Sequence, residues 1–148
     1  MPFSDRELFA RLIKCEAGGE GIDGMKSVAT VIMNRVHVSG GEYMRTNQGS
    51  LRNVISEPRQ FTCMMSTVYG EVNPQTVWAA SPEQIHYDVA DWALSGNKHW
   101  GAGESLWYFN PFVPTCIQSF PYGTGSGRYF NRVVQHCFYV PTAQYYKT

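Results

Sequence analysis

Apolar residues near the N-terminus recur at the spacing of one face of an α-helix. Ser4 and Glu7 form a capping-box pattern that favours a helix start, and Gly18 and Gly19 favour its end. These signals predict a helix from residue 5 to about residue 16 or 17. Its apolar face consists of Leu8, Phe9, Leu12 and Ile13.

A second segment with helical spacing follows, and it is the clearest amphipathic segment of the chain. Asp23 is its candidate N-cap. Lys26, Asn34 and Arg35 are expected to lie off the apolar face. The apolar positions are Met25, Val28, Ala29, Ile32 and Val36.

A third helix is predicted after residue 80. Ser81 is the expected cap, Pro82 occupies the first helical position, and Gln84 completes a capping-box pattern. The helix is expected to continue to about residues 95 and 96. Its apolar positions are Ile85, Val89, Trp92 and Ala93.

The remaining segments lack a long helical period. A short helical turn at residues 51–55 is expected to stop at Pro58, and residues 60–69 predict a strand or hairpin that ends near Gly70. Residues 40–49 and 120–127 are typical of loops, whereas residues 105–111 and 133–140 are typical of extended strands.

These elements predict one domain over residues 1–148, an α+β unit that is mainly helical with a small β element. A chain of 148 residues can bury a core without the help of metals or disulfides. Charged residues make up 16% and aromatic residues 14% of the chain, which excludes disorder. The formal net charge of zero argues against a nucleic-acid partner held through its phosphates.

No apolar run approaches the ~20 residues that cross a bilayer, so no membrane span is expected. The N-terminal residues lack a basic region followed by an apolar one, so no signal peptide is expected.

The cysteines lie far apart and form no Cys-x-x-Cys pair, which favours buried thiols over bridges. If one bridge forms, Cys116 with Cys137 is the expected pair, because it would close the glycine-rich loop between them. The histidines lack the spacing of a zinc site, so no metal is expected. They are His37, His86, His99 and His136.

Glu16 is the strongest candidate for chemistry, since it lies at the predicted C-terminal end of an apolar helix. The helix dipole and apolar packing both disfavour its charged form and are expected to raise the carboxyl pKa. A carboxylic acid that stays protonated near neutral pH can act as a general acid. From the pattern alone, a surface glutamate that ends a helix is the more common arrangement. Glu20 is expected to be a solvated loop charge or a supporting partner.

A cysteine nucleophile is the main alternative chemistry. Cys15, Cys63 or Cys137 with His136 as a base would suit a cysteine-dependent peptidase or amidase, and such partners meet only in the fold.

Residues 12–21, Leu-Ile-Lys-Cys-Glu-Ala-Gly-Gly-Glu-Gly, resemble the E-A-x-G-E signature of the SleB/CwlJ cell wall hydrolases, which degrade spore cortex peptidoglycan during germination. Further blocks agree in order: the Asn34-Arg35 pair, residues 54–61, and the Leu-Trp-Tyr-Phe-Asn-Pro block at residues 106–111. Residues 136–143 resemble the ending of the small, CwlJ-like branch. The chain is thereby identified as similar to that family over nearly its whole length.

This resemblance implies a lysozyme-like fold related to lytic transglycosylases, with Glu16 as the catalytic acid facing a groove for amino sugars. Phe61 and Phe109 are the residues most readily assigned to packing instead. The residues expected to bind substrate or support the site are Glu20, Asn34, Gln60, Phe61, Trp107, Tyr108, Phe109 and Asn110. Among them, Asn34, Gln60 and Asn110 are expected to hold N-acetyl groups, and Trp107 or Tyr108 to stack on sugars.

The resemblance also implies a setting. It predicts cortex glycan strands as the substrate, a spore coat protein as a partner, and a place at the boundary of coat and cortex. Calcium dipicolinate is implied as a germination activator, whereas the chemistry itself needs no cofactor. The N-terminal peptidoglycan-binding module of the large branch is missing, so targeting is expected to come from elsewhere.

Three alternatives for the function stay open at this point: two catalytic mechanisms and one role without catalysis. One catalytic glutamate fits a lytic transglycosylase, whereas hydrolysis would need Glu20 or Asp23 to position water. A non-catalytic protein of coat or cortex assembly is the third alternative.

Overall fold

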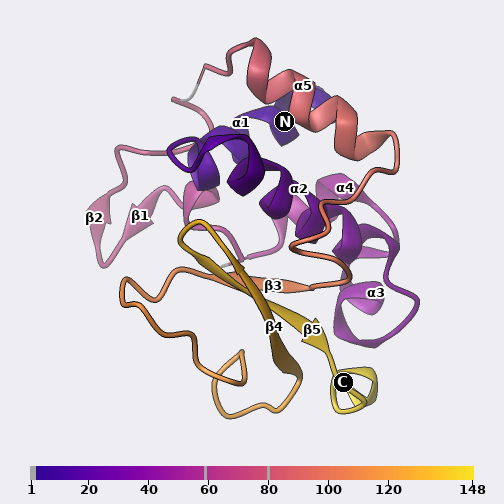
Figure 1. The fold of residues 1–148 in the computed structure, drawn as a ribbon. Helices are drawn as coiled ribbons and strands as arrows, with labels where there is room; N and C mark the ends of the chain where they lie inside the picture. The colour runs from indigo at the N-terminus through magenta and orange to yellow at the C-terminus, as the bar shows by residue number, and fades with distance from the viewer. Residues whose placement is uncertain (1–2, 59, 80) are drawn as a thin grey trace.

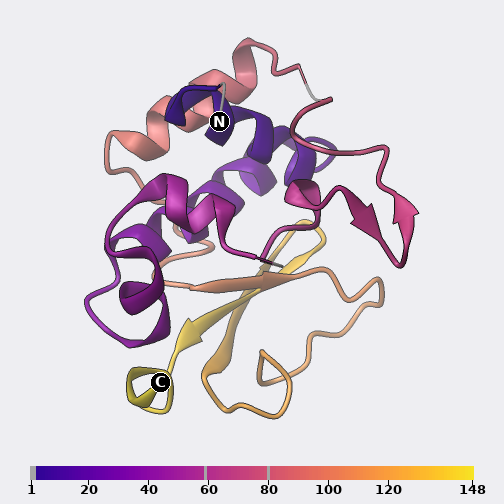
Figure 2. The same ribbon diagram turned by 180° about the vertical axis from the view of Figure 1, so that it is seen from behind.

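The computed structural model describes residues 3–58, 60–79 and 81–148. A layer of helices packs on a small antiparallel sheet, and a separate two-stranded β-hairpin protrudes on one side of the molecule (Figures 1 and 2). The helices are α1 (Asp5–Ala17), α2 (Gly21–His37), α3 (Gly41–Asn47), α4 (Leu51–Ser56) and α5 (Gln84–Leu94). The strands are β1 (Thr67–Val68), β2 (Glu71–Val72), β3 (Trp107–Phe109), β4 (Gly127–Val133) and β5 (His136–Pro141), and 3-10 turns are η1 (Thr62–Met64) and η2 (Tyr145–Lys147).

Helix α1 confirms the first prediction. The Ser4 hydroxyl accepts a hydrogen bond from the backbone N–H of Glu7, and the helix ends before Gly18. The predicted apolar face is fully buried against α2 and α5. Glu16 therefore projects from the last turn of a helix that is fixed by the core.

Helix α2 differs from the prediction in two respects. It begins at Gly21, so Asp23 lies in its first turn and does not cap it. Residues 27–36 are all buried, including Asn34 and Arg35, which are 5% and 6% exposed. The reason is that α2 packs on the other helices and also on β3 and β4 of the sheet, so it has no solvated side along this stretch.

Two further helices correct the sequence interpretation. Helix α5 begins later than predicted, because Glu83 rather than Ser81 is its N-cap and shares a capping box with His86. Helix α3 occupies most of the segment expected to be a loop. Its glycines lie at the ends of the helix, where they do not weaken it, and Tyr43 in its interior is buried.

The predicted hairpin at residues 60–69 forms later along the chain. Thr67 pairs with Val72 around a tight turn in which Tyr69 and Gly70 have φ of 53° and 80°. Such positive φ values at both turn positions match the twist of a two-residue hairpin. The residues before it, which were expected to be extended, include the 3-10 turn η1.

The predicted strand at residues 133–140 is in fact part of two strands. Strand β4 ends at Val133, the chain turns at Val134 and Gln135, and β5 begins at His136. The apolar pattern runs straight across this turn, which is why it suggested one strand. The sheet order is β3-β5-β4, all antiparallel, and the expected strand around residues 105–111 is confirmed as β3.

The sheet packs on α2 through Val31 and Phe138 and on α3 through Tyr43 and Trp107. The Cys116–Cys137 disulfide ties the loop between β3 and β4 to β5, as expected for that pair. The broader expectation of free thiols is wrong, because Cys15 and Cys63 are also bridged. Within the described ranges, no helix has the length and apolar character of a membrane span.

Candidate active site

Glu16 lies where the helical layer meets the sheet. Its Oε1 accepts a hydrogen bond of 2.8 Å from the hydroxyl of Tyr108 on β3. Its Oε2 lies 3.4 Å from Sγ of Cys63, which has no proton to donate because it is bridged to Cys15. The carboxyl is thus contacted on both oxygens, and the residue as a whole is partly exposed.

Burial raises the pKa of the Glu16 carboxyl above its ordinary value. The Tyr108 hydrogen bond and then the charges of His136 and Arg35 lower it, but burial prevails. The pKa of Tyr108 lies well above its usual value because of burial and the Glu16 charge, so Tyr108 keeps its proton and remains a donor. The predicted direction of the Glu16 shift is confirmed, with apolar packing as its cause.

Glu20 forms a second acidic position beside the first. Its Oε2 lies 2.6 Å from Nδ1 of His136 in an ion-pair contact that lacks the alignment of a hydrogen bond, and its Oε1 accepts from the backbone N–H of Gln135 at 3.1 Å. The side chains of Glu20 and His136 are 9% and 11% exposed. Gly24 makes this possible, since a Cβ there would lie 2.5 Å from Cβ of Glu20.

His136 connects the two acidic positions. Its ring packs edge-on against Tyr108, with centroids 5.1 Å apart, and Tyr108 in turn holds Glu16. The structure therefore places Glu20 beside the site through His136, and its supporting role stays a prediction. No local sequence pattern indicates His136 as the partner of Glu20, because the pair joins the start of α2 to β5.

Arg35 is the buried cation of the site. Its Nε donates to the carbonyl of Leu106 at 2.7 Å, and Nη1 donates to Oε1 of Gln60 at 3.2 Å. Its guanidinium lies 4.6 Å from the ring centre of Tyr43. Gln60 thus orients Arg35, whose charge acts on Glu16. Sequence reasoning placed Arg35 off the buried face and missed this role, although the Asn34-Arg35 pair belongs to the resemblance.

Several residues expected at the site are structural instead. The Asn34 side-chain amide donates to the carbonyls of Gly103 and Ser105, both at 2.9 Å, so it is not available for an N-acetyl group. Trp107 is 5% exposed and packs on Tyr43 and Tyr145, so it does not stack on a sugar.

The two phenylalanines also belong to packing. Phe61 is buried in the helical core, and Phe109 stacks on Phe120 with ring centres 5.1 Å apart. Their assignment to packing agrees with the alternative weighed from the sequence. Both lie next to site residues and hold the backbone there.

Asn110 lies at the edge of the site and shapes the loop after β3. Its Oδ1 accepts from the N–H of Phe112 at 2.9 Å, and its Nδ2 donates to Oε1 of Gln135 at 3.3 Å. Together with Phe112 and Arg132 it lines an open cavity of about 380 Å³. Binding of an N-acetyl group by Asn110 stays a prediction.

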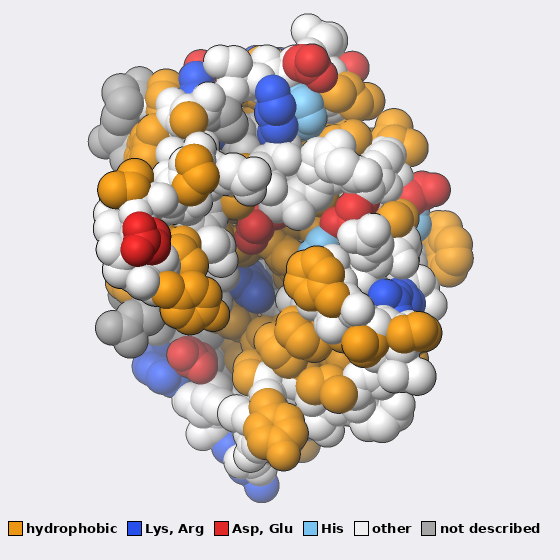
Figure 3. Space-filling view, turned by 90° about the vertical axis from the view of Figure 1, so that its left-hand side faces the viewer, with side chains coloured by type: hydrophobic (Ala, Val, Ile, Leu, Met, Phe, Trp, Pro, Cys, Tyr) orange, Lys and Arg blue, Asp and Glu red, His pale blue; other side chains and the backbone are white. Residues whose placement is uncertain are grey.

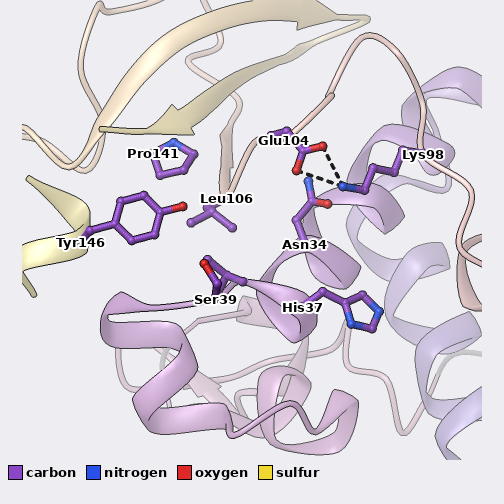
Figure 4. A pocket seen from close by; sticks show the side chains of 9 residues that line it. Asn34, His37, Ser39, Lys98, Glu104, Leu106, Pro141 and Tyr146 are labelled. Atoms are coloured by element: carbon purple, nitrogen blue, oxygen red, sulfur yellow. Dashed lines mark hydrogen bonds and ion pairs between the residues drawn. The ribbon is translucent and has the colours of Figure 1, made fainter. Parts of the chain in front are cut away.

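The molecular surface is hollowed on the side of the β1–β2 hairpin. Figure 3 shows acidic, basic and histidine side chains deep in this hollow and hydrophobic side chains around its rim. A different cavity, of about 280 Å³, lies beside the C-terminal end of α2 (Figure 4). Lys98 and Glu104 point toward one another in its wall, and Glu16 is not among its lining residues. That cavity is therefore separate from the candidate acid.

The cysteine alternative loses its nucleophile, because all four cysteines are in disulfides. Among the described residues, no group of three or more His, Cys, Asp and Glu side chains is arranged to hold a metal ion.

Comparison with known proteins agrees with this geometry. The sequence model of a family described as Cell Wall Hydrolase matches residues 19–139, a segment that contains Glu20 and starts just after Glu16. The chain is 30% identical to the cell wall hydrolase CwlJ of Bacillus subtilis (strain 168), covering 95% of this chain and 88% of that protein. A spore cortex-lytic enzyme of Oceanobacillus iheyensis is 31% identical over 76% of this chain and 34% of its own length.

Solved structures show the same fold. The catalytic domain of the germination-specific lytic transglycosylase SleB from Bacillus anthracis superposes with a TM-score of 0.62 at 25% identity, covering 93% of this chain and 97% of that one. The catalytic domain of the Bacillus cereus SleB protein gives a TM-score of 0.64 at 25% identity, over 91% and 88% of the two chains. The expected lysozyme-like fold is confirmed, and the chain belongs to the cell wall hydrolase family.

Proposed function

We propose that this chain cleaves the glycan strands of spore cortex peptidoglycan as a lytic transglycosylase, with Glu16 as its catalytic acid. The observation that carries the proposal is the carboxyl of a partly exposed glutamate, whose pKa burial raises and whose Oε1 is held by Tyr108. The relatives, a spore cortex-lytic enzyme and a germination-specific lytic transglycosylase, support the cortex as substrate.

The reaction uses Glu16 twice. With Oε1 bonded to Tyr108, the acidic proton resides on Oε2 and passes to the glycosidic oxygen as the bond from that oxygen to C1 breaks. C1 belongs to a muramic residue of the glycan strand. The C6 hydroxyl of this residue then attacks C1 and transfers its own proton to the Glu16 carboxylate. The products are a free hydroxyl on the leaving sugar and a 1,6-anhydro ring. The charge of Arg35 and the hydrogen bond from Tyr108 stabilise the Glu16 carboxylate between the two steps.

The other candidate carboxylates are already engaged. Glu20 contacts His136 and the N–H of Gln135, and Asp23 Oδ1 lies 3.0 Å from Nε2 of His99. A hydrolytic enzyme would need one of them to position water opposite the acid. Their engagement favours transfer to the substrate's own hydroxyl.

The products in water enriched with heavy oxygen test this mechanism. We expect muropeptides with anhydro-muramic ends and no label at new termini, because water does not enter the bond. A hydrolytic muramidase acting on the same cortex is the control and should label every new reducing end. Uniform labelling without anhydro product would instead mean hydrolysis, and absence of any product would favour an assembly protein without turnover.

The pH dependence of Tyr108→Phe tests the acid. Glu16 donates only while protonated, so the rate falls as pH rises through its raised pKa. The lost hydroxyl no longer stabilises the carboxylate, which raises the pKa further and should move this falling limb to higher pH. The measurement is kcat/KM against pH for both proteins. A limb that stays in place or moves to lower pH would contradict the role of Tyr108.

The finer setting is part of the proposal. We place the enzyme in the spore, at the boundary of coat and cortex. A coat-protein partner and a response to calcium dipicolinate remain predictions from the resemblance. The location and the coat-protein partner are tested by locating the protein in spores with and without their coat proteins.

A further inference from the structure

The Cys15–Cys63 disulfide lies directly against the candidate acid. It joins the last turn of α1, one residue before Glu16, to the 3-10 turn η1. Sγ of Cys63 is 3.4 Å from Oε2 of Glu16, and Cys63 is 4% exposed. The sulfur therefore covers one side of the oxygen that Tyr108 leaves unbound.

The oxidation state of this sulfur decides what Oε2 meets. A disulfide sulfur has no proton, so it shields Oε2 without hydrogen-bonding to it. A free thiol at the same place would be a donor and would stabilise the charged form of Glu16. The other groups that act on Glu16 are Tyr108 from β3, His136 from β5 and Arg35 from α2, none of which is a partner in this disulfide.

The bridge also fixes the segment beside the site. The N–H of Val77 donates to the carbonyl of Cys63 at 3.0 Å, and the Asn73 amide donates to the carbonyls of Thr62 and Met65. These bonds join the segment that follows the β1–β2 hairpin to η1 and its neighbour Met65. The disulfide is the covalent link between that unit and the helix that presents Glu16.

The two sulfurs differ in accessibility. Cys15 is partly exposed and lines an open cavity of about 400 Å³ together with Lys14, Pro74 and Gln75. Cys63 is buried on the side of Glu16. A small reductant can therefore reach Cys15 from the cavity. The other sulfur, Cys63, is then released as a thiol beside Glu16.

We propose that the Cys15–Cys63 disulfide is a positioning element of the active site and that the enzyme turns over only while this bond is intact. The inference rests on the proposed function. In the reduced state the Cys63 thiol can donate to Oε2, and the covalent link between α1 and η1 is lost, so that side-chain bonds such as that of Arg11 to the carbonyl of Val77 are left to hold this segment on α1. Both changes disturb the acidic proton that Glu16 carries on Oε2 for transfer to the substrate.

Reduction by a dithiol follows ordinary thiol–disulfide exchange. A thiolate of the reductant attacks Sγ of Cys15, the S–S bond breaks, and Cys63 leaves as a thiolate that takes a proton from water. The second thiol of the reductant then displaces Cys15 and closes a cyclic disulfide. Two electrons pass to the protein, which ends with two cysteine thiols.

Dithiothreitol titration of the full chain is the first test. Anhydro-muropeptide release from decoated cortex should fall by about tenfold or more and return on reoxidation. Alkylation and mass spectrometry identify the reduced bridge, and circular dichroism reports the fold. The inference would be overturned if turnover stayed unchanged while the protein remained folded and alkylation showed that Cys15 and Cys63 were reduced. No turnover in the oxidised protein would instead overturn the proposed function.

A pair of double variants distinguishes a role of the disulfide in positioning Glu16 from a role in stabilising the fold alone. This comparison remains informative if the reduced chain unfolds. Cys15→Ala with Cys63→Ala removes the bridge and leaves no donor, whereas Cys15→Ala with Cys63→Ser leaves a hydroxyl beside Oε2. Both should fall below wild type. The serine variant should show the lower kcat, a similar KM and a falling pH limb at lower pH. Identical profiles for the two variants would refute the positioning role.

The second disulfide provides the matched control. Cys116→Ala with Cys137→Ala removes a bridge that does not contact Glu16. Assayed below its melting temperature, this variant should retain turnover and remain sensitive to dithiothreitol. If this variant were insensitive to dithiothreitol, the effect of reduction would belong to the Cys116–Cys137 bridge, and the inference would be overturned.

Discussion

Glu16→Gln is expected to leave a folded protein whose release of cortex fragments is reduced by about 10²-fold or more. The amide keeps the shape of the side chain and still accepts the Tyr108 hydrogen bond, but it has no acidic proton to transfer. The measurement is the initial rate of muropeptide release at matched protein concentration, with circular dichroism as the check on folding.

Glu20→Gln is the matched control, because it makes the same change at the supporting carboxylate. It should cost less, since Glu20 acts through His136 and not on the substrate. Turnover of Glu16→Gln near that of wild type would reject Glu16 as the acid. An equal loss in both variants would make Glu20 a catalytic partner and would favour hydrolysis.

Phe61→Ala should lower the free energy of unfolding by about 3–5 kcal/mol, the usual cost of deleting a buried aromatic side chain. Phe61 is 1% exposed in the helical core, and the Arg35 guanidinium lies 5.5 Å from its ring centre. The cavity left behind would lie next to η1 and Cys63. Urea unfolding followed by circular dichroism measures the loss.

Phe109→Ala is the comparison for this variant. Phe109 is only partly buried and stacks on Phe120, so its removal should cost less. If Phe61→Ala kept its stability but lost turnover, the residue would belong to substrate binding and the assignment to packing would be wrong.

The parts of the fold that local sequence signals determine were predictable. The cap at Ser4, the apolar face of α1 and the glycines that follow it place Glu16 at a helix end, and the structure agrees. The raised pKa of Glu16 follows from the same local context, because a carboxyl that ends an apolar helix is desolvated by that helix's packing.

The rest of the site depends on contacts between distant segments. Arg35 reads as a polar residue of an amphipathic helix, and only the sheet behind α2 buries it. Cys15 and Cys63 are separated by 48 residues, and nothing in their local sequence indicates that they meet. His136 reaches Glu20 because β5 turns back beside the start of α2. Periodicity carries no information on such pairings.

The burial of α2 on all sides has a consequence for motion. Because both layers pack on the same helix, neither layer can shift without breaking contacts that hold the other, and the two should behave as one cooperative unit. Two segments lie outside this unit, the β1–β2 hairpin and the loop after Asn110, and the Cys15–Cys63 and Cys116–Cys137 disulfides anchor the chain at each of them. A bulky, cross-linked polymer would then meet a centre that does not rearrange, so that Glu16 and its partners keep their geometry during every encounter.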